Sequence, residues 1–150
     1  MAVPLDYPDK RICVIGLGYV GLTLAATMAE IGFDVHGVEI RDDVRDGLEH
    51  GEPHFFEPGL PEMIERAQDA ERLSLAKHIT DETQARVYIV TVGTPLDAAG
   101  KSRMDMVENV SREIAAVLRE GDLVIMRSTV KIGTTRDIVM PILNDACVTY

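Results

Sequence analysis

Strand-like and helix-like segments alternate along the whole chain. Runs rich in β-branched and other apolar residues predict strands, most of them covered on both faces. They lie at residues 11–15, 33–39, 73–76, 86–92 and 122–126. Segments with helical periodicity or helix-favouring composition lie at residues 22–30, 41–48, 61–67, 81–85, 106–118 and 133–142. This alternation predicts an α/β fold of the Rossmann type, a doubly wound and mainly parallel sheet with helices on both faces.

Glycine and proline mark the ends of the last two predicted helices. Gly121 is a C-cap signal after the helix at residues 106–118. Pro141 is expected to end or kink the last helix, because proline cannot donate the helical hydrogen bond. The sequence has no internal repeat, low-complexity segment or linker, so we expect one domain at residues 11–150. Residues 1–10 lack the features of a signal peptide and are expected to form a loose leader.

A glycine motif, Gly16-x-Gly18-x-x-Gly21, joins the first predicted strand to the first predicted helix. In this context G-x-G-x-x-G is a strong signal for a dinucleotide site. Gly16 permits the tight turn, Gly18 lets the backbone approach a pyrophosphate, and Gly21 lets the helix pack close to the strand. We also expect Gly18 to adopt a conformation that only glycine takes easily. The helix N-terminus then offers N–H groups and partial positive charge to the phosphates.

The second predicted strand ends in an acidic residue, Glu39. It lies about 20 residues past the glycines, where an acid accepts hydrogen bonds from the adenosine ribose hydroxyls. This position favours NAD, because the acid would repel the additional phosphate of NADP. Arg41 is a second candidate cofactor contact. It favours NADP instead, since a nearby arginine accommodates the additional phosphate. The alternative is a glycine turn that binds no dinucleotide.

Two further loops follow strands at the edge of the sheet where open α/β sheets bind ligands. Thr94 follows the strand at residues 86–92, and Ser128 and Thr129 follow the strand at residues 122–126. A separate loop contains Phe55 and Phe56. For these two rings, core packing and a place near the ligand are equally supported.

Net charge restricts the classes of partner. The 150 residues contain 46% hydrophobic and 27% charged residues, and the formal net charge is −10. Such acidity disfavours nucleic acid and anionic membranes. No apolar run reaches membrane-spanning length. We therefore expect a cytoplasmic protein.

Cysteine and histidine give no sign of a metal site. Cys13 lies in the first predicted strand and is expected to be a small buried hydrophobe, while Cys147 has no histidine nearby in sequence. The four histidines have no ligand spacing and are expected on the surface or in loops.

Four motifs together resemble the N-terminal NAD-binding domain of the UDP-glucose/GDP-mannose dehydrogenase family, the nucleotide-sugar 6-dehydrogenases. They are Gly16-Leu17-Gly18-Tyr19-Val20-Gly21, Glu57-Pro58-Gly59-Leu60, Gly93-Thr94-Pro95-Leu96-Asp97 and Ser128-Thr129-Val130-x-x-Gly133-Thr134-Thr135. They occur in the family's order and cover nearly the whole chain. The sequence departs from the family pattern at Gly93, where proline is usual, at Lys131-Ile132, and at Glu39, where aspartate is more usual.

The resemblance implies oxidation of the C6 alcohol of a nucleotide-activated hexose to a carboxylate, with reduction of two NAD. It also implies roles for individual residues. Glu39 would hold the adenosine ribose, Thr94 would contact the cofactor near its ribose, and Thr129 would lie by the nicotinamide and help hold the catalytic water. The cofactor diphosphate would be held by Gly16, Gly18, Tyr19, Val20 and Gly21.

The family's nucleophilic cysteine and its catalytic lysine and asparagine lie in later domains. The chain therefore resembles a fragment, and we expect it to be inactive alone, with the nucleotide sugar bound by the other domains of a homodimeric parent protein. Acetamido-hexoses are slightly favoured by the Arg-Ser-Thr-Val segment at residues 127–130. Two other functions are open: a non-catalytic nucleotide-sensing Rossmann module, and a domain that binds S-adenosylmethionine.

Overall fold

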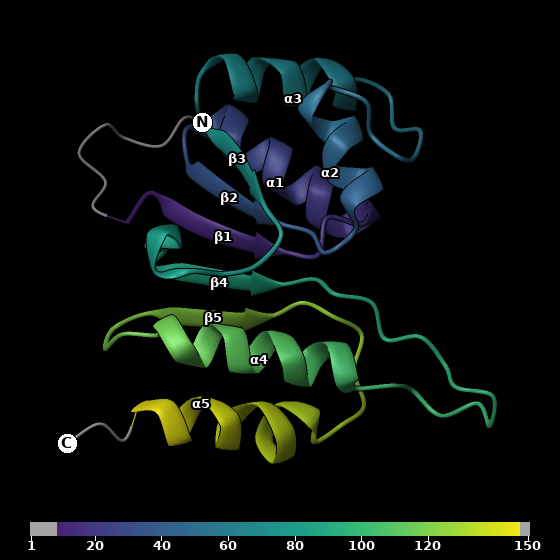
Figure 1. The fold of residues 1–150 in the computed structure, drawn as a ribbon, viewed down its shortest axis with the longest axis vertical. Coiled ribbons are helices and arrows are strands. Elements are labelled where there is room, and N and C mark those ends of the chain that lie inside the picture. The colour runs from purple at the N-terminus through teal and green to yellow at the C-terminus, as the bar shows by residue number, and fades with distance from the viewer. Residues whose placement is uncertain (1–8, 148–150) are drawn as a thin grey trace.

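The computed structural model describes the backbone of residues 9–147 and the side chains of residues 9–145. Within these residues, five parallel strands form one sheet in the order β3-β2-β1-β4-β5 (Figure 1). The strands are β1 (Arg11–Ile15), β2 (Asp34–Val38), β3 (Leu73–Ala76), β4 (Val87–Val90) and β5 (Leu123–Met126). The strand order reverses between β1 and β4, which is the switch point of a doubly wound sheet. The predicted α/β fold class is confirmed.

The register of the sheet brings the ends of the strands into one row. Ile15 pairs with Val38 on one side and with Val90 on the other. Val90 in turn pairs with Met126, and Val38 with Ala76. The residues that follow each strand therefore leave the sheet along the same edge, which is where the loops predicted to bind a ligand meet.

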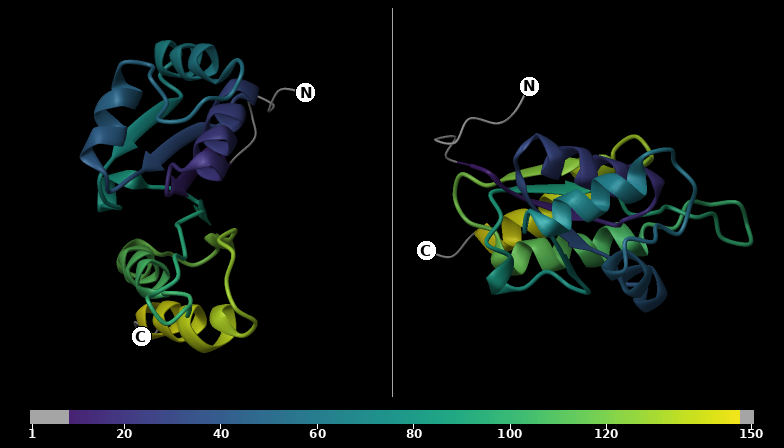
Figure 2. Two further views of the ribbon diagram at one scale, coloured as in Figure 1. Left: turned by 90° about the vertical axis from the view of Figure 1, so that its right-hand side faces the viewer. Right: turned by 90° about the horizontal axis from the view of Figure 1, so that it is seen from above.

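Five helices cover the sheet: α1 (Tyr19–Ile31), α2 (Asp42–Glu49), α3 (Leu60–Asp69), α4 (Asp105–Val117) and α5 (Met140–Cys147). Helices α1 to α3 lie beside β1–β3, and α4 and α5 lie together beside β4 and β5 (Figure 2).

Alternate residues of β1 point to opposite faces of the sheet and enter separate cores. Ile12 and Val14 join the core formed with α1, α2 and α3. Cys13 and Ile15 join the core that contains Ile114 of α4. The four consecutive apolar residues of β1, which follow the exposed Arg11, are therefore explained by burial on both faces.

Three predicted features differ from the structure. The segment at residues 81–85 forms only a short 3-10 turn, Asp81–Thr83. Helix α4 ends at Val117, because the next residue, Leu118, has an extended backbone, and Gly121 instead occupies the turn into β5 with φ +85°. Pro141 does not end the last helix, since α5 continues to Cys147, but a π-helical turn at Thr135–Val139 comes directly before it.

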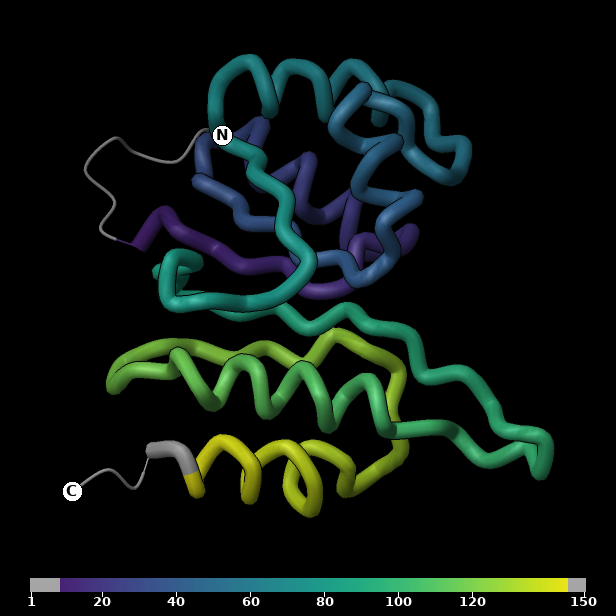
Figure 3. Tube along the Cα trace, viewed as in Figure 1, coloured from purple at the N-terminus to yellow at the C-terminus, as the bar shows by residue number. Residues whose placement is uncertain are grey.

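The loop between β4 and α4 projects from the ligand edge of the sheet (Figure 3). An antiparallel bridge between Leu96 and Ser102 closes this loop. The Asp97 carboxylate accepts hydrogen bonds from the N–H groups of Ala99 and Lys101, at 2.9 and 2.8 Å. The loop is therefore held by its own backbone and side-chain contacts.

Candidate dinucleotide site

Gly16 and Gly21 form the base of the glycine loop and leave no room for a side chain. Gly16 has φ +90°, and a Cβ atom there would lie 3.0 Å from the backbone of Val92. A Cβ atom on Gly21 would lie 1.9 Å from the carbonyl oxygen of Gly16. The structure thus gives Gly16 the tight turn and Gly21 the close packing of helix on strand that the sequence predicted.

Gly18 differs from the other two glycines. Its φ of −69° and ψ of −168° are open to any residue, so the expectation of a conformation special to glycine is wrong. A Cβ atom at Gly18 would have no other atom within 4 Å. The Cβ would thus enter open space at the N-terminus of α1, where a diphosphate would approach. The position fits the cofactor because a side chain would fill that space.

The N-terminus of α1 is open to an anionic ligand. It has neither a side-chain cap nor an acidic residue in its first turn, whereas α2 begins with Asp42 and Asp43. The first N–H groups of a helix have no partner within the helix, and its dipole adds positive charge there. Tyr19 and Val20, which begin α1, are 58% and 47% exposed. These are the features of a phosphate site at a helix N-terminus.

Glu39 lies between the glycine loop and the start of α2. Its Oε2 accepts a hydrogen bond from the Leu17 N–H at 2.9 Å, and its Oε1 accepts one from the Arg41 N–H at 3.1 Å. Each carboxylate oxygen has two lone pairs, so both can still accept a ligand hydroxyl. The acid therefore stands beside the glycine loop, as required of a residue that binds the adenosine ribose.

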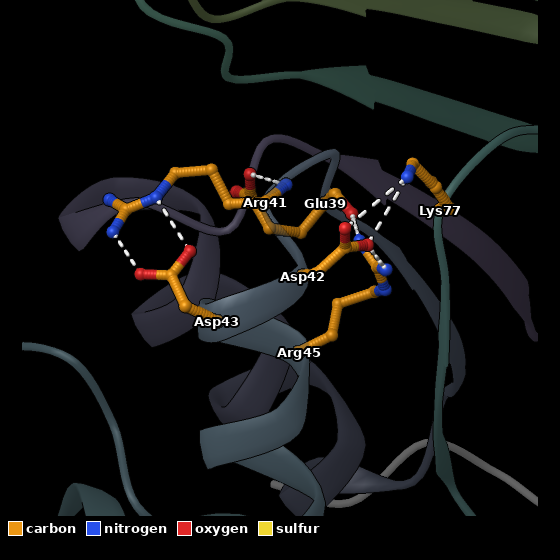
Figure 4. Close-up of polar contacts among 6 residues, drawn as sticks. All are labelled: Glu39, Arg41, Asp42, Asp43, Arg45 and Lys77. Atoms are coloured by element: carbon orange, nitrogen blue, oxygen red, sulfur yellow. Dashed lines mark hydrogen bonds and ion pairs between the residues drawn. The ribbon is translucent and has the colours of Figure 1, made fainter.

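The Arg41 side chain is directed away from Glu39 (Figure 4). Its guanidinium makes a two-pronged ion pair with Asp43, with Nε and Nη2 at 3.2 and 2.5 Å from the two carboxylate oxygens. This pair raises the pKa of Arg41 and lowers the pKa of Asp43. Although Arg41 was a candidate cofactor contact, the structure gives its side chain a protein partner.

Thr94 and Thr129 meet at the other half of the ligand edge. The Thr94 hydroxyl donates to the Thr129 carbonyl oxygen at 2.7 Å and so ties the loop after β4 to the loop after β5. The Thr129 side chain is exposed, and its hydroxyl has no hydrogen-bond partner among the described residues.

Thr91 and Ser128 connect these loops to the strands. The Thr91 hydroxyl lies 2.8 Å from the carbonyl oxygens of Ile15 and Gly16. The Ser128 hydroxyl donates to the Val92 carbonyl oxygen at 2.8 Å. Sequence analysis placed Ser128 at the ligand edge without a specific role and placed Thr91 inside a predicted strand, whereas β4 ends at Val90 and Thr91 directly follows it.

The loop that contains Glu57 reaches the first residue of α1. The Tyr19 hydroxyl donates to the Glu57 carboxylate at 2.7 Å, and the rings of Tyr19 and Phe55 are 5.0 Å apart. Phe55 also packs against the core, whereas Phe56 is 89% exposed. The two phenylalanines therefore have different environments, and only Phe55 combines core packing with a place beside the glycine loop.

Cys13 is unsuited to nucleophilic chemistry here. It is buried, and this burial, with a smaller effect of Glu113, raises the pKa of its thiol to about 12. The predicted buried role of Cys13 is confirmed. The Cys147 side chain lies outside the described residues. His36 departs from the expectation of a surface histidine, because it is half-buried in β2 beside the Ser74 hydroxyl, and burial lowers its pKa.

No helix in the described part of the chain is long and apolar enough to cross a membrane. No group of three or more histidine, cysteine, aspartate or glutamate side chains there is arranged to hold a metal ion.

Comparison with known proteins agrees with this geometry. The model of the UDP-glucose/GDP-mannose dehydrogenase family, NAD binding domain, matches residues 10–149. Pseudomonas aeruginosa UDP-glucose 6-dehydrogenase is 42% identical over 129 residues, which are 83% of this chain and 28% of that protein. Methanococcus maripaludis UDP-N-acetyl-D-mannosamine dehydrogenase is 34% identical over 137 residues, which are 89% of this chain and 31% of that protein.

Solved structures agree as well. A ternary complex of Pseudomonas aeruginosa GDP-mannose dehydrogenase matches with a TM-score of 0.84 and 32% identity, over 91% of this chain and 32% of that one. The chain spans about a third of the length of such relatives. Its motifs, fold and family match together show that the chain belongs to the UDP-glucose/GDP-mannose dehydrogenase family and carries that family's NAD-binding domain.

Proposed function

We propose that this chain is the NAD-binding part of a nucleotide-sugar 6-dehydrogenase, which oxidises the C6 alcohol of a UDP- or GDP-hexose to a carboxylate. The observation that carries the proposal is the uncapped N-terminus of α1, which faces the open space at Gly18 and lies next to Glu39. Relatives named UDP-glucose 6-dehydrogenase and GDP-mannose 6-dehydrogenase support the choice of reaction. NAD, when bound, accepts the hydride removed at each of the two oxidation steps.

The residues of this chain bind and orient in this proposal. The N–H groups at the start of α1 hold the diphosphate, and Gly18 gives it room. Glu39 accepts hydrogen bonds from the adenosine ribose hydroxyls. Thr94 holds the loop of Thr129 in place. The Thr129 hydroxyl, which has no partner within residues 9–145, lies in this proposal at the nicotinamide end, where it helps to hold the water that completes the oxidation.

We further propose that the 150-residue chain alone binds NAD but does not oxidise a nucleotide sugar. Covalent catalysis of this kind needs a thiolate within reach of the substrate C6 and a base to accept its proton. Cys13 cannot serve, because its thiol is buried in the core on the α4 side of the sheet and stays protonated. Its buried free thiol fits a reducing compartment, which supports the expected cytoplasmic location.

The test has two measurements on the same chain. Calorimetry with NAD and S-adenosylmethionine should show binding of NAD only, and a mixture with NAD and a panel of UDP- and GDP-hexoses should form no NADH. A nucleotide-sensing module would also bind NAD. The proposal is distinguished from it by the full-length protein, which must oxidise a member of the panel. Turnover by the chain that survives Cys13→Ser but is lost with Cys147→Ser would contradict the proposal and make Cys147 the nucleophile.

A further inference from the structure

Three cations lie around the start of α2: Arg41 just before the helix, Arg45 within it, and Lys77 just after β3. Asp42 and Asp43 pair with all three (Figure 4). Asp42 pairs with Arg45 and, at 3.2 Å, with Lys77. Arg45 is anchored further, since it donates to the Glu39 carbonyl oxygen and its side chain is only 15% exposed. Asp43 pairs with Arg41 alone. Each cation near Glu39 therefore has an acidic partner in the described structure.

Arg41 is the cation best placed to contact the ribose end of the ligand. Its own N–H donates to Glu39 Oε1, so its backbone lies at the acid that binds the ribose. Its side chain is 57% exposed, and among the described residues it pairs with Asp43, while Glu39 adds a smaller electrostatic attraction. A freed Arg41 would offer a planar pair of donors that matches a phosphate.

We propose that Asp43 is a specificity-determining residue for the cofactor: by pairing with Arg41 it occupies the guanidinium that, among the described residues, is best placed to accommodate the 2′-phosphate of NADP. The preference for NAD then has two parts. Glu39 accepts the ribose hydroxyls and repels a 2′-phosphate, and Asp43 prevents the neighbouring arginine from offsetting that repulsion. This inference rests on the dinucleotide site of the proposed function.

The pair is exposed, so its effect is moderate. Side-chain exposures of 57% and 69% place Arg41 and Asp43 in solvent, where water and salt screen an ion pair. The effect of the pair on a dissociation constant is therefore on the order of a few-fold. We expect Asp43→Asn to increase NADP affinity by this amount, and to change NAD affinity much less, because NAD has no group for Arg41 to bind.

Calorimetry with NAD and NADP on a small set of variants tests this inference. Asp46→Asn is the matched control, because it removes the same charge from an exposed position of α2 whose carboxylate has no recorded partner among the described residues. It should leave the ratio of the two dissociation constants nearly unchanged. Asp43→Glu should keep the pair and the preference. Adding Arg41→Ala to Asp43→Asn should abolish the gain in NADP affinity.

Each contrary result has a distinct meaning. An unchanged ratio in Asp43→Asn, an equal gain in Asp46→Asn, or a gain that persists without Arg41 would overturn the inference while NAD binding stands. Absence of NAD binding by the unmodified chain would overturn the proposed function together with the inference. Circular dichroism checks folding, and Asp43→Ser provides a second variant that removes the charge with a residue favoured near helix N-termini.

Discussion

At the scale of the residue, the three glycines of one motif have three physical roles. Gly16 is required by a positive φ, and Gly21 by a carbonyl oxygen that would lie 1.9 Å from a side chain. Gly18 is required by neither. Its side-chain position is open in the described structure, so the fold does not require glycine there. The proposed diphosphate does, because a side chain would occupy its space.

This difference predicts opposite outcomes for two glycine variants. Gly18→Val should fold, with a loss of stability of about 1 kcal/mol or less from a poorer N-cap residue, but should not bind NAD. Gly21→Ala should destabilise the domain, because its Cβ collides with backbone. Thermal unfolding and calorimetry on both variants make the comparison. If Gly18→Val bound NAD with unchanged affinity, the diphosphate would not lie on this loop.

Glu39 has a structural and a binding role that one substitution can separate. Glu39→Gln keeps an oxygen to accept the Leu17 N–H, so the glycine loop should hold its shape, while the amide nitrogen replaces the oxygen that accepts the Arg41 N–H and that bond is lost. The substitution removes the charge that strengthens hydrogen bonds to the ribose, a loss of about 1.5–3 kcal/mol for bonds to a charged group. NAD affinity should fall about tenfold or more. Equal affinity in calorimetry would show that Glu39 does not hold the ribose.

At the scale of the element, the local sequence pattern was sufficient for the strands but not for the contacts between loops. The alternation of Ile12 and Cys13 into two cores follows directly from an apolar strand. The Thr94–Thr129 bond joins residues 35 positions apart, and the Tyr19–Glu57 bond joins residues 38 apart. The local periodicity of a sequence does not predict contacts between residues so far apart.

The errors at element ends have a similar origin. Helix α4 ends four residues before Gly121, and Asp122 accepts the Arg119 N–H and closes a turn of its own. Asp43 was one of several acids in a predicted helix, and only the folded chain shows that it pairs with Arg41. Motif spacing located the glycine loop, Glu39, Thr94 and Thr129, but not the residues that hold or restrain them.

The Tyr19–Glu57 bond ties the start of α1 to the loop before α3, and it has a signature in pH titration. The hydrogen bond to Glu57 and the nearby charge raise the pKa of Tyr19 above its ordinary value of 10.0. Glu57→Gln should lower the pKa back toward that value, which NMR titration of the tyrosine ring carbon measures. An identical midpoint in both proteins would show that the bond does not form in solution.

The sign of the effect on stability follows from the direction of this shift. A group whose pKa is raised in the folded state stabilises the fold while it is protonated. The contribution of the Tyr19–Glu57 bond is therefore fully present below the ordinary tyrosine pKa. It is lost as the pH rises through the higher pKa of folded Tyr19, and the Glu57→Gln variant should lack this additional loss.

At the scale of the whole molecule, the two halves of the sheet meet at the site. The β1–β2 half supplies the glycine loop and Glu39, and the β4–β5 half supplies Thr94 and Thr129. The Thr91 hydroxyl joins the halves through the carbonyl oxygens of Ile15 and Gly16. A dinucleotide that spans this edge would contact both halves, so binding should stabilise the domain as one unit.

NAD should therefore raise the thermal unfolding temperature of the chain. A ligand that binds only the folded state at a hundred times its dissociation constant adds about 2.7 kcal/mol. For a domain of this size, each 1 kcal/mol corresponds to roughly 2–4 °C, so we expect a rise of roughly 5–10 °C. Differential scanning calorimetry with increasing NAD measures this rise.

Gly18→Val is the control, since its fold should be kept and its cofactor site blocked. A single transition that moves upward with NAD in the unmodified chain, but not in this variant, is the expected result. Two transitions of which only one moves would contradict the view that both halves of the sheet hold the cofactor.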